Sequence, residues 1–172
     1  SGLASNYTLS GATINVTIIP RTLNVSLSRE YDGTTTVSGA LLTPTFDSLQ
    51  GGETLALSGT GSVSTANVGS SKAVTLGTIA LAAGSGNPNN YTLNTATMNV
   101  TQRVINLDGI RAYDATTNVL SSDITTFGNI VSGETLTISG TGSVGTNSVA
   151  MNKVITTGSL ALGNGSGLAS NY

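Results

Sequence analysis

The sequence contains no cysteine and no histidine. Without cysteine the chain forms neither disulfides nor thiolate metal sites. Without histidine it lacks the Ser-His-Asp and Cys-His catalytic arrangements and the common zinc ligand sets. Charged residues make up only 8% of the chain, and the formal net charge is −2. Because so few basic residues cannot create a positive surface patch, we predict neither nucleic acid nor an anionic membrane surface as a partner.

Long apolar runs are also absent, so no segment approaches the roughly 18 apolar residues that a membrane span requires, and membrane insertion is not expected. No helical stripe of apolar residues persists either. Short segments with apolar residues at every second position recur instead, as at residues 12–18, 22–27 and 104–107. Such alternation is typical of strands with one buried face, and it predicts an all-β fold.

The strongest feature that is present is an internal repeat. The stretch Gly52–Val63 returns almost unchanged at Gly133–Val144, an offset of 81 positions. The first seven residues, Ser1–Tyr7, are identical to the last seven, Ser166–Tyr172. A repeat of this length is too long for one turn of a solenoid, and it indicates a tandem array of small modules.

The repeat also places the module boundaries. Pro20 cannot donate a hydrogen bond to a strand ladder, so we place one boundary there and the equivalent one at Gln102-Arg103. Residues 21–103 are then the first module. Residues 104–172 are a second module that lacks its final strand, and residues 1–20 are the final strand of a preceding repeat. The predicted fold is two small β-sandwich modules, Ig-like or β-grasp-like, arranged end to end.

Several local features carry predictions within each module. Phe46 and Phe127 are the only two phenylalanines and occupy equivalent positions, so we expect both rings in the cores, presented by a single helical turn or a bent loop. Gly33 lies in an Asp-Gly turn, and its replacement by Ala115 predicts that positive φ is not required there. The glycine-rich stretch at residues 58–62 predicts a hairpin turn rather than a phosphate cradle, since no Gly-Lys-Ser/Thr ending follows it.

Candidate chemistry is sparse. Glu30 and Asp32 could form the paired carboxylates of a glycosidase, but the second copy replaces Glu30 with Ala112, so we expect no catalytic residues. The aspartates lack the spacing of a calcium loop and are interpreted as turn acceptors; they are Asp32, Asp47, Asp108, Asp114 and Asp123. We therefore predict no metal-binding residues, no cofactor and no cofactor-binding residues.

Two modifications stay open. Lys72 and Lys153 are the only lysines and stand at equivalent positions, which is compatible with a Lys-Asn isopeptide staple or with ammonium groups in water. Asn-x-Ser/Thr triplets are glycosylation acceptors, although a chain rich in these residues produces them by chance. They occur at Asn6, Asn15, Asn24, Asn90, Asn99 and Asn164.

The order of several motifs resembles that of the YDG domain. The motifs are Tyr31-Asp32-Gly33-Thr34-Thr35, Phe46, Gly52-Glu53-Thr54-Leu55, Asn67–Lys72, Asn90-Tyr91-Thr92-Leu93 and Ala96–Val100. The resemblance covers one complete copy and most of a second. It implies a tandem module of large bacterial haemagglutinin-like surface proteins, where such domains stand beside related MBG modules.

The function implied is a non-enzymatic spacer that projects the adhesive domain of an extracellular bacterial surface protein. The expected partners are neighbouring repeats of the same chain. Two alternatives stay open, a glycan-binding or self-binding module and a filament subunit assembled by strand addition. The filament hypothesis rests on residues 7–18, which match the segment that closes the first module. In another copy they could occupy the position of the final strand that the second module lacks.

Overall fold

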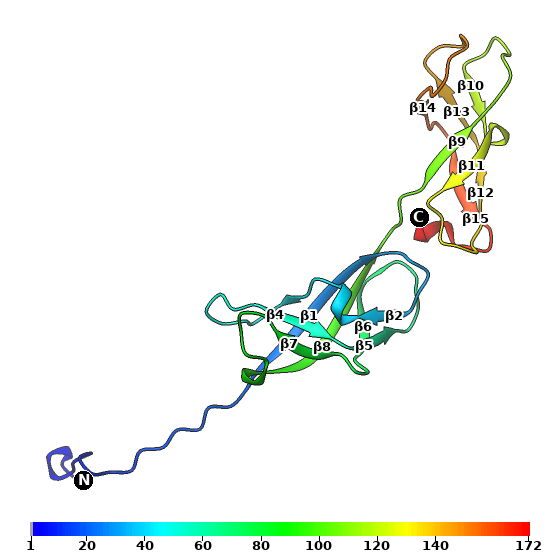
Figure 1. Cartoon of the computed structure of the whole chain (residues 1–172). Coiled ribbons are helices and arrows are strands. Elements are labelled where there is room, and N and C mark those ends of the chain that lie inside the picture. The colour runs from blue at the N-terminus through cyan, green and yellow to red at the C-terminus, as the bar shows by residue number, and fades with distance from the viewer. Residues whose placement is uncertain (1) are drawn as a thin grey trace.

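A computed structural model describes residues 2–172 and is all-β, with strands joined by loops and short 3-10 turns. The first repeat contains β1 (Arg21–Glu30), β2 (Thr36–Ser38), β3 (Thr45–Phe46), β4 (Leu55–Ser58), β5 (Thr60–Val63), β6 (Gly69–Thr75), β7 (Ala80–Ala83) and β8 (Tyr91–Thr101). The second repeat contains β9 (Asn106–Gly109), β10 (Asn118–Leu120), β11 (Ile124–Gly128), β12 (Leu136–Ser139), β13 (Thr141–Val144), β14 (Ile155–Thr156) and β15 (Ala161–Asn164). Figure 1 shows the two sets of strands in separate regions of the molecule, with the C-terminus close to the point where they meet.

The 3-10 turns are η1 (Ala4–Asn6), η2 (Gly39–Leu41), η3 (Pro88–Asn90), η4 (Ser121–Asp123) and η5 (Ala169–Asn171). None of the helical elements in the described part of the chain is long and apolar enough to cross a bilayer.

Two long strands form the centre of the first repeat. Alternate residues of β1, namely Leu23, Val25 and Leu27, are buried with at most 3% of their surface exposed. The inward face of β8 is equally apolar, with Met98 fully buried. The two strands run parallel, and Leu27 lies opposite Met98. The alternation in the sequence therefore correctly identifies the buried faces.

The strands of the first repeat form a six-stranded sheet and a two-stranded sheet. The order of the larger sheet is β2-β5-β6-β8-β1-β3, and β4 pairs with β7 in the smaller one. Leu57 of β4 belongs to the same apolar cluster as Val25 and Met98 of the larger sheet. One core is thus shared by both sheets.

Glycines turn the chain between these sheets. The glycine-rich sequence at residues 58–62 predicts a hairpin turn, and this prediction is wrong: β4 pairs with β7, whereas β5 pairs with β2 and β6. Gly59 stands between them at φ +75°, and a Cβ there would lie 2.0 Å from the Thr78 carbonyl oxygen. Only glycine tolerates both the backbone conformation and the close approach, so the corner depends on it.

The second repeat has counterparts of β1 to β7, but its described residues hold no counterpart of β8. Its strands form three sheets, β10-β13-β14, β9-β11 and β12-β15. The strands β9 and β14, which correspond to β1 and β6, therefore share no neighbour. Apolar residues are correspondingly more exposed here, since Tyr113 is 64% exposed whereas the equivalent Tyr31 is 4% exposed.

The N-terminal segment also differs from its prediction. Residues 12–18 are predicted to be a strand with one buried face, but in this structure they form no strand and every residue from 7 to 20 is exposed. Figure 1 shows this segment as the thin blue trace that projects from the first repeat. Its apolar residues have no sheet partner against which to pack.

Two smaller predictions need correction. Phe46 and Phe127 do occupy equivalent positions, opposite Val25 and Leu107, but short strands present them and both rings are only half-buried. Gly33 and Ala115 both adopt positive φ, at 75° and 62°. The substitution of alanine therefore does not mean that the turn avoids the left-handed region.

Candidate functional site: the junction between the repeats

Residues from both repeats meet at a single carboxylate. Tyr31 follows β1 in the first repeat, and its hydroxyl donates to Glu134 Oε1 at 2.5 Å. Tyr172 of the second repeat donates to Glu134 Oε2 at 2.6 Å. The two phenol rings meet edge to face, with centroids 5.5 Å apart. Hydrogen bonds to an ionised acceptor are stronger than neutral ones, so this contact ties one repeat to the other.

Burial and this carboxylate act on the tyrosines in the same direction. Burial, followed by the hydrogen bond to Glu134, raises the pKa of Tyr31 to about 12. The pKa of Tyr172 is also raised, by burial first and then by Glu134. Both hydroxyls consequently stay protonated at neutral pH and remain donors.

Arg103 links the two repeats at the boundary between them. Its Nε donates to the Asn129 carbonyl at 2.7 Å, and one terminal nitrogen donates to the Tyr31 carbonyl at 3.3 Å. A further ion pair joins it to Glu30 at 3.5 Å. Since the planar guanidinium offers several donors in fixed directions, Arg103 holds groups of both repeats at once.

Asn171 is a polar residue with only 1% of its surface exposed. Its Oδ1 accepts from the Val68 amide at 3.0 Å, and its Nδ2 donates to Asn67 Oδ1 at 3.1 Å. Its carbonyl accepts from the Arg103 amide at 2.9 Å. A buried amide without partners would be costly, so these bonds favour one relative placement of the repeats.

The turn at Gly33 completes the contact. A Cβ at this position would lie 2.8 Å from Val131 Cγ1 in the second repeat. Glycine is therefore needed here for close approach as well as for its positive φ.

The base of each repeat is built alike. In the first repeat Tyr91 donates to Glu53 at 2.5 Å, and its hydroxyl accepts from the Gln50 amide. Tyr172, Glu134 and the Val131 amide repeat this arrangement in the second. The junction between the repeats consists of this arrangement in the second repeat together with Tyr31 of the first.

The acidic residues singled out in the sequence bind different partners. Glu30 pairs with Arg103, whereas Asp32 pairs with Arg29 and accepts from the Thr34 amide. Asp114 and Asp123 likewise accept from backbone amides two or three positions away, as turn acceptors do. The interpretation of Asp47 as a turn acceptor is wrong, because it accepts from the amide of Asn24, 23 positions away. Among residues 2–172 no group of three or more acidic, histidine or cysteine residues is arranged to hold a metal ion.

The ammonium groups of Lys72 and Lys153 hold loop carbonyls. The Lys72 ammonium donates to the carbonyls of Thr65 and Asn67 at 2.6 and 2.5 Å. Lys153 donates to the Ser148 carbonyl at 2.5 Å. Burial lowers the pKa of Lys72 from its ordinary value. Both ammonium groups are thus bonded to loop carbonyls at the protein surface.

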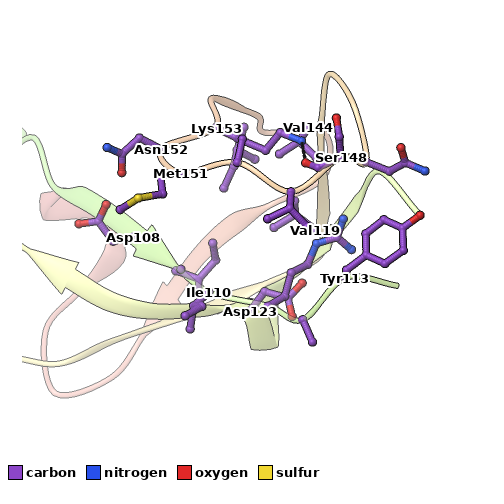
Figure 2. Close-up of a pocket in the computed structure, with 18 of the residues that line it drawn as sticks. Asp108, Ile110, Tyr113, Val119, Asp123, Val144, Ser148, Met151, Asn152 and Lys153 are labelled. Atoms are coloured by element: carbon purple, nitrogen blue, oxygen red, sulfur yellow. Dashed lines mark hydrogen bonds between the residues drawn. The ribbon is translucent and has the colours of Figure 1, made fainter. Parts of the chain in front are cut away.

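A cavity of about 430 Å³ lies in the second repeat, between β9 and the segment that precedes β14. Figure 2 shows Ile110 and Tyr113 on one side of it and Met151 and Lys153 on the other. Its lining is mixed and includes Asp108 and Asp123 as well as apolar residues such as Val119. In the first repeat the corresponding position is occupied by β8, between β1 and β6.

Comparison with known families gives one result. The family model described as YDG domain matches residues 13–98, which is half of the chain. The match begins inside the N-terminal segment and ends inside β8. No curated protein and no solved structure gives a significant match.

Proposed function

Because the chain belongs to the YDG domain family, we propose that its two repeats are tandem β-sandwich modules that act as a structural spacer in a large bacterial cell-surface adhesin. The modules span residues 21–103 and 104–172 and are arranged end to end. In this role they are extracellular, non-enzymatic, and hold an adhesive domain away from the cell.

The observation that supports this proposal most directly is the junction. A spacer holds a distal domain away from the cell only if successive repeats keep a fixed relative orientation, because an array with flexible joints coils back on itself. Here Glu134 accepts one hydroxyl from each repeat, and the buried Asn171 bonds across the same boundary. Groups that are satisfied only in one arrangement favour that arrangement over bending.

Two further features support a spacer. The first repeat contains two long strands, β1 and β8, and the 11 residues of β8 span about 36 Å at about 3.3 Å per residue. The surface carries few ionic groups, since only 8% of residues are charged. Such a surface attracts charged partners only weakly over long distances.

The proposal is tested by the growth of length with repeat number. Chains with two, four and eight repeats are prepared, and the maximum dimension of each monomer is measured by small-angle X-ray scattering. A stiff array doubles in length with each doubling of repeats, whereas a flexible chain grows only about 1.4-fold. Growth near 1.4-fold would contradict the spacer mechanism. A Gly/Ser chain of the same length serves as the flexible control.

A further inference from the structure

The strand β8 completes the first repeat. It lies between β1, to which it is parallel, and β6, to which it is antiparallel. Its inward residues Ala96, Met98 and Val100 are buried to 4% exposure or less. The six-stranded sheet is therefore continuous only because β8 bridges its two halves.

The second repeat is open at the same place. Its described residues contain no strand between β9 and β14, so the two halves of the sheet are separate. The cavity of about 430 Å³ lies at this position, lined by Leu107 and Ile110 from the β9 side and by Lys153 and Ile155 from the β14 side (Figure 2). Unpaired strand edges next to apolar side chains can accept an added strand.

The N-terminal segment has the sequence of the missing strand. Residues 7–17 match β8 residues 91–101 at eight of eleven positions, and Ile14 replaces Met98 at one of the others. Ile14 and Val16 correspond to buried residues of β8, yet they are 72% and 85% exposed. The segment carries a core-forming face that has nothing to cover it in a single copy.

The open position between β9 and β14 also retains a backbone feature that binds β8 in the first repeat. Ser71 has positive φ, 50°, and its amide donates to Asn99 of β8 at 2.7 Å. The equivalent Asn152 has φ 52°. Asn15 corresponds to Asn99 in the N-terminal segment. The backbone bulge and its side-chain acceptor are thus both present, on separate parts of the chain.

The N-terminal segment cannot reach the open position between β9 and β14 of its own chain. Only residues 18–20 separate it from β1, and three residues span at most about 10 Å. Figure 1 shows the segment leaving the first repeat on the side away from the second repeat. Among the described residues, only those of a second molecule can therefore supply this strand.

From these observations we propose that the open position between β9 and β14 binds residues 8–17 of a second copy of this chain as an added strand. By the register of the first repeat, Ile14 lies opposite Gly109 and Lys153, and Thr13 lies opposite Val154. The added strand is parallel to β9 and antiparallel to β14. This inference goes beyond the spacer role, because it assigns a binding site and its occupant.

The same contact brings a second pair of surfaces together. Tyr113 corresponds to Tyr31 but is 64% exposed, and Glu53 with its donor Tyr91 corresponds to Glu134 with Tyr172. Strand addition places Tyr113 of one copy at Glu53 of the next and so reproduces the internal junction. Because the two surfaces differ, the contact is heterologous and generates head-to-tail chains.

Residues 1–7 oppose this association. They are identical to residues 166–172. Tyr7 of the incoming copy and Tyr172 of the receiving copy therefore compete for one position beside Glu134. Removing residues 1–7 leaves the strand intact and should strengthen the association.

The first test measures association by sedimentation velocity over a concentration series, for the full chain and for the chain without residues 1–7. We expect concentration-dependent head-to-tail species, stronger after the truncation. Ile14→Asp with Val16→Asp should weaken association by about 100-fold or more, since burying each aliphatic side chain contributes roughly tenfold or more.

The matched control is Leu41→Asp in the first repeat. Leu41 is also apolar, is 85% exposed, and lies outside both the N-terminal segment and the cavity lining. It should leave association unchanged. Equal loss in Leu41→Asp and in the Ile14/Val16 variant would indicate nonspecific hydrophobic contact and would overturn the proposal. A truncated chain that stays monomeric at all concentrations would also overturn it.

The second test fixes the register. The chain has no cysteine, so engineered thiols are the only ones present. Residues directly opposite in antiparallel strands have Cα atoms about 4.5–5.5 Å apart, within reach of a disulfide. A mixture of Thr13→Cys and Val154→Cys chains should form a disulfide-linked dimer under mild oxidation. A mixture of Thr13→Cys and Ala150→Cys chains should not. Equal cross-linking in the two mixtures would contradict the register.

Discussion

Replacing Tyr31 by phenylalanine removes one hydroxyl from the junction and keeps the ring. The hydroxyl donates to Glu134 at 2.5 Å, and only 4% of the Tyr31 surface is exposed. A hydrogen bond to a charged group contributes about 1.5–3 kcal/mol. Since Glu134 keeps its bond from Tyr172, we expect a loss near the lower limit, about 1.5 kcal/mol. Urea unfolding followed by circular dichroism measures this change in the free energy of unfolding.

Tyr113→Phe is the matched control, because it makes the same chemical change at the equivalent residue, which is 64% exposed. Its expected effect is about 0.5 kcal/mol or less. A double-mutant cycle of Tyr31→Phe with Glu134→Gln isolates the coupling between the two groups. Equal losses from Tyr31→Phe and Tyr113→Phe, or a coupling energy near zero, would refute the argument that this bond holds the repeats together.

Three further outcomes are expected. The folded-state pKa of Tyr31 is raised from 10.0 to about 12. The contribution of Tyr31 to stability is therefore complete below pH 10 and is lost as the pH rises towards 12. The free energy of unfolding of Tyr31→Phe, measured over the same alkaline range, should lack this loss. Gly33→Ala should destabilise the chain by about 1–2 kcal/mol through its positive φ and the approach to Val131, whereas Ala115→Gly should stabilise it by about 0.5 kcal/mol, both measured by urea unfolding. Phe46→Ala should cost about 2 kcal/mol in the same assay, because the ring is only half-buried, and an unchanged midpoint would remove Phe46 from the core.

The sequence predicts the faces of strands better than their neighbours. Alternation correctly identifies the buried residues of β1 and β8, since side chains of a strand point to opposite faces in turn. It contains no information on which strands pair. The parallel pairing of β1 with β8 joins residues about 70 positions apart, and the corner at Gly59 resembles a hairpin in sequence although its flanking strands belong to different sheets.

The junction is harder to predict than the fold. Tyr31 and Glu134 are 103 positions apart, and neither belongs to a known motif for chemistry. One signal was present in the sequence. In a chain with only 8 acidic residues, Glu53 and Glu134 recur at equivalent positions, as do Tyr91 and Tyr172. Their recurrence marks a repeated local contact, but only the structure shows that Tyr31 of the preceding repeat completes it.

The central claim is that the junction holds the two repeats in one orientation. It is tested most directly by the distance distribution between spin labels at Ala80→Cys and Ala161→Cys, two exposed positions on the equivalent strands β7 and β15. Labelled chains are diluted with unlabelled chains, so that only distances within one molecule contribute to the double electron–electron resonance signal. We predict a single narrow peak that broadens in Tyr31→Phe. A broad distribution in the unmodified junction would contradict the account.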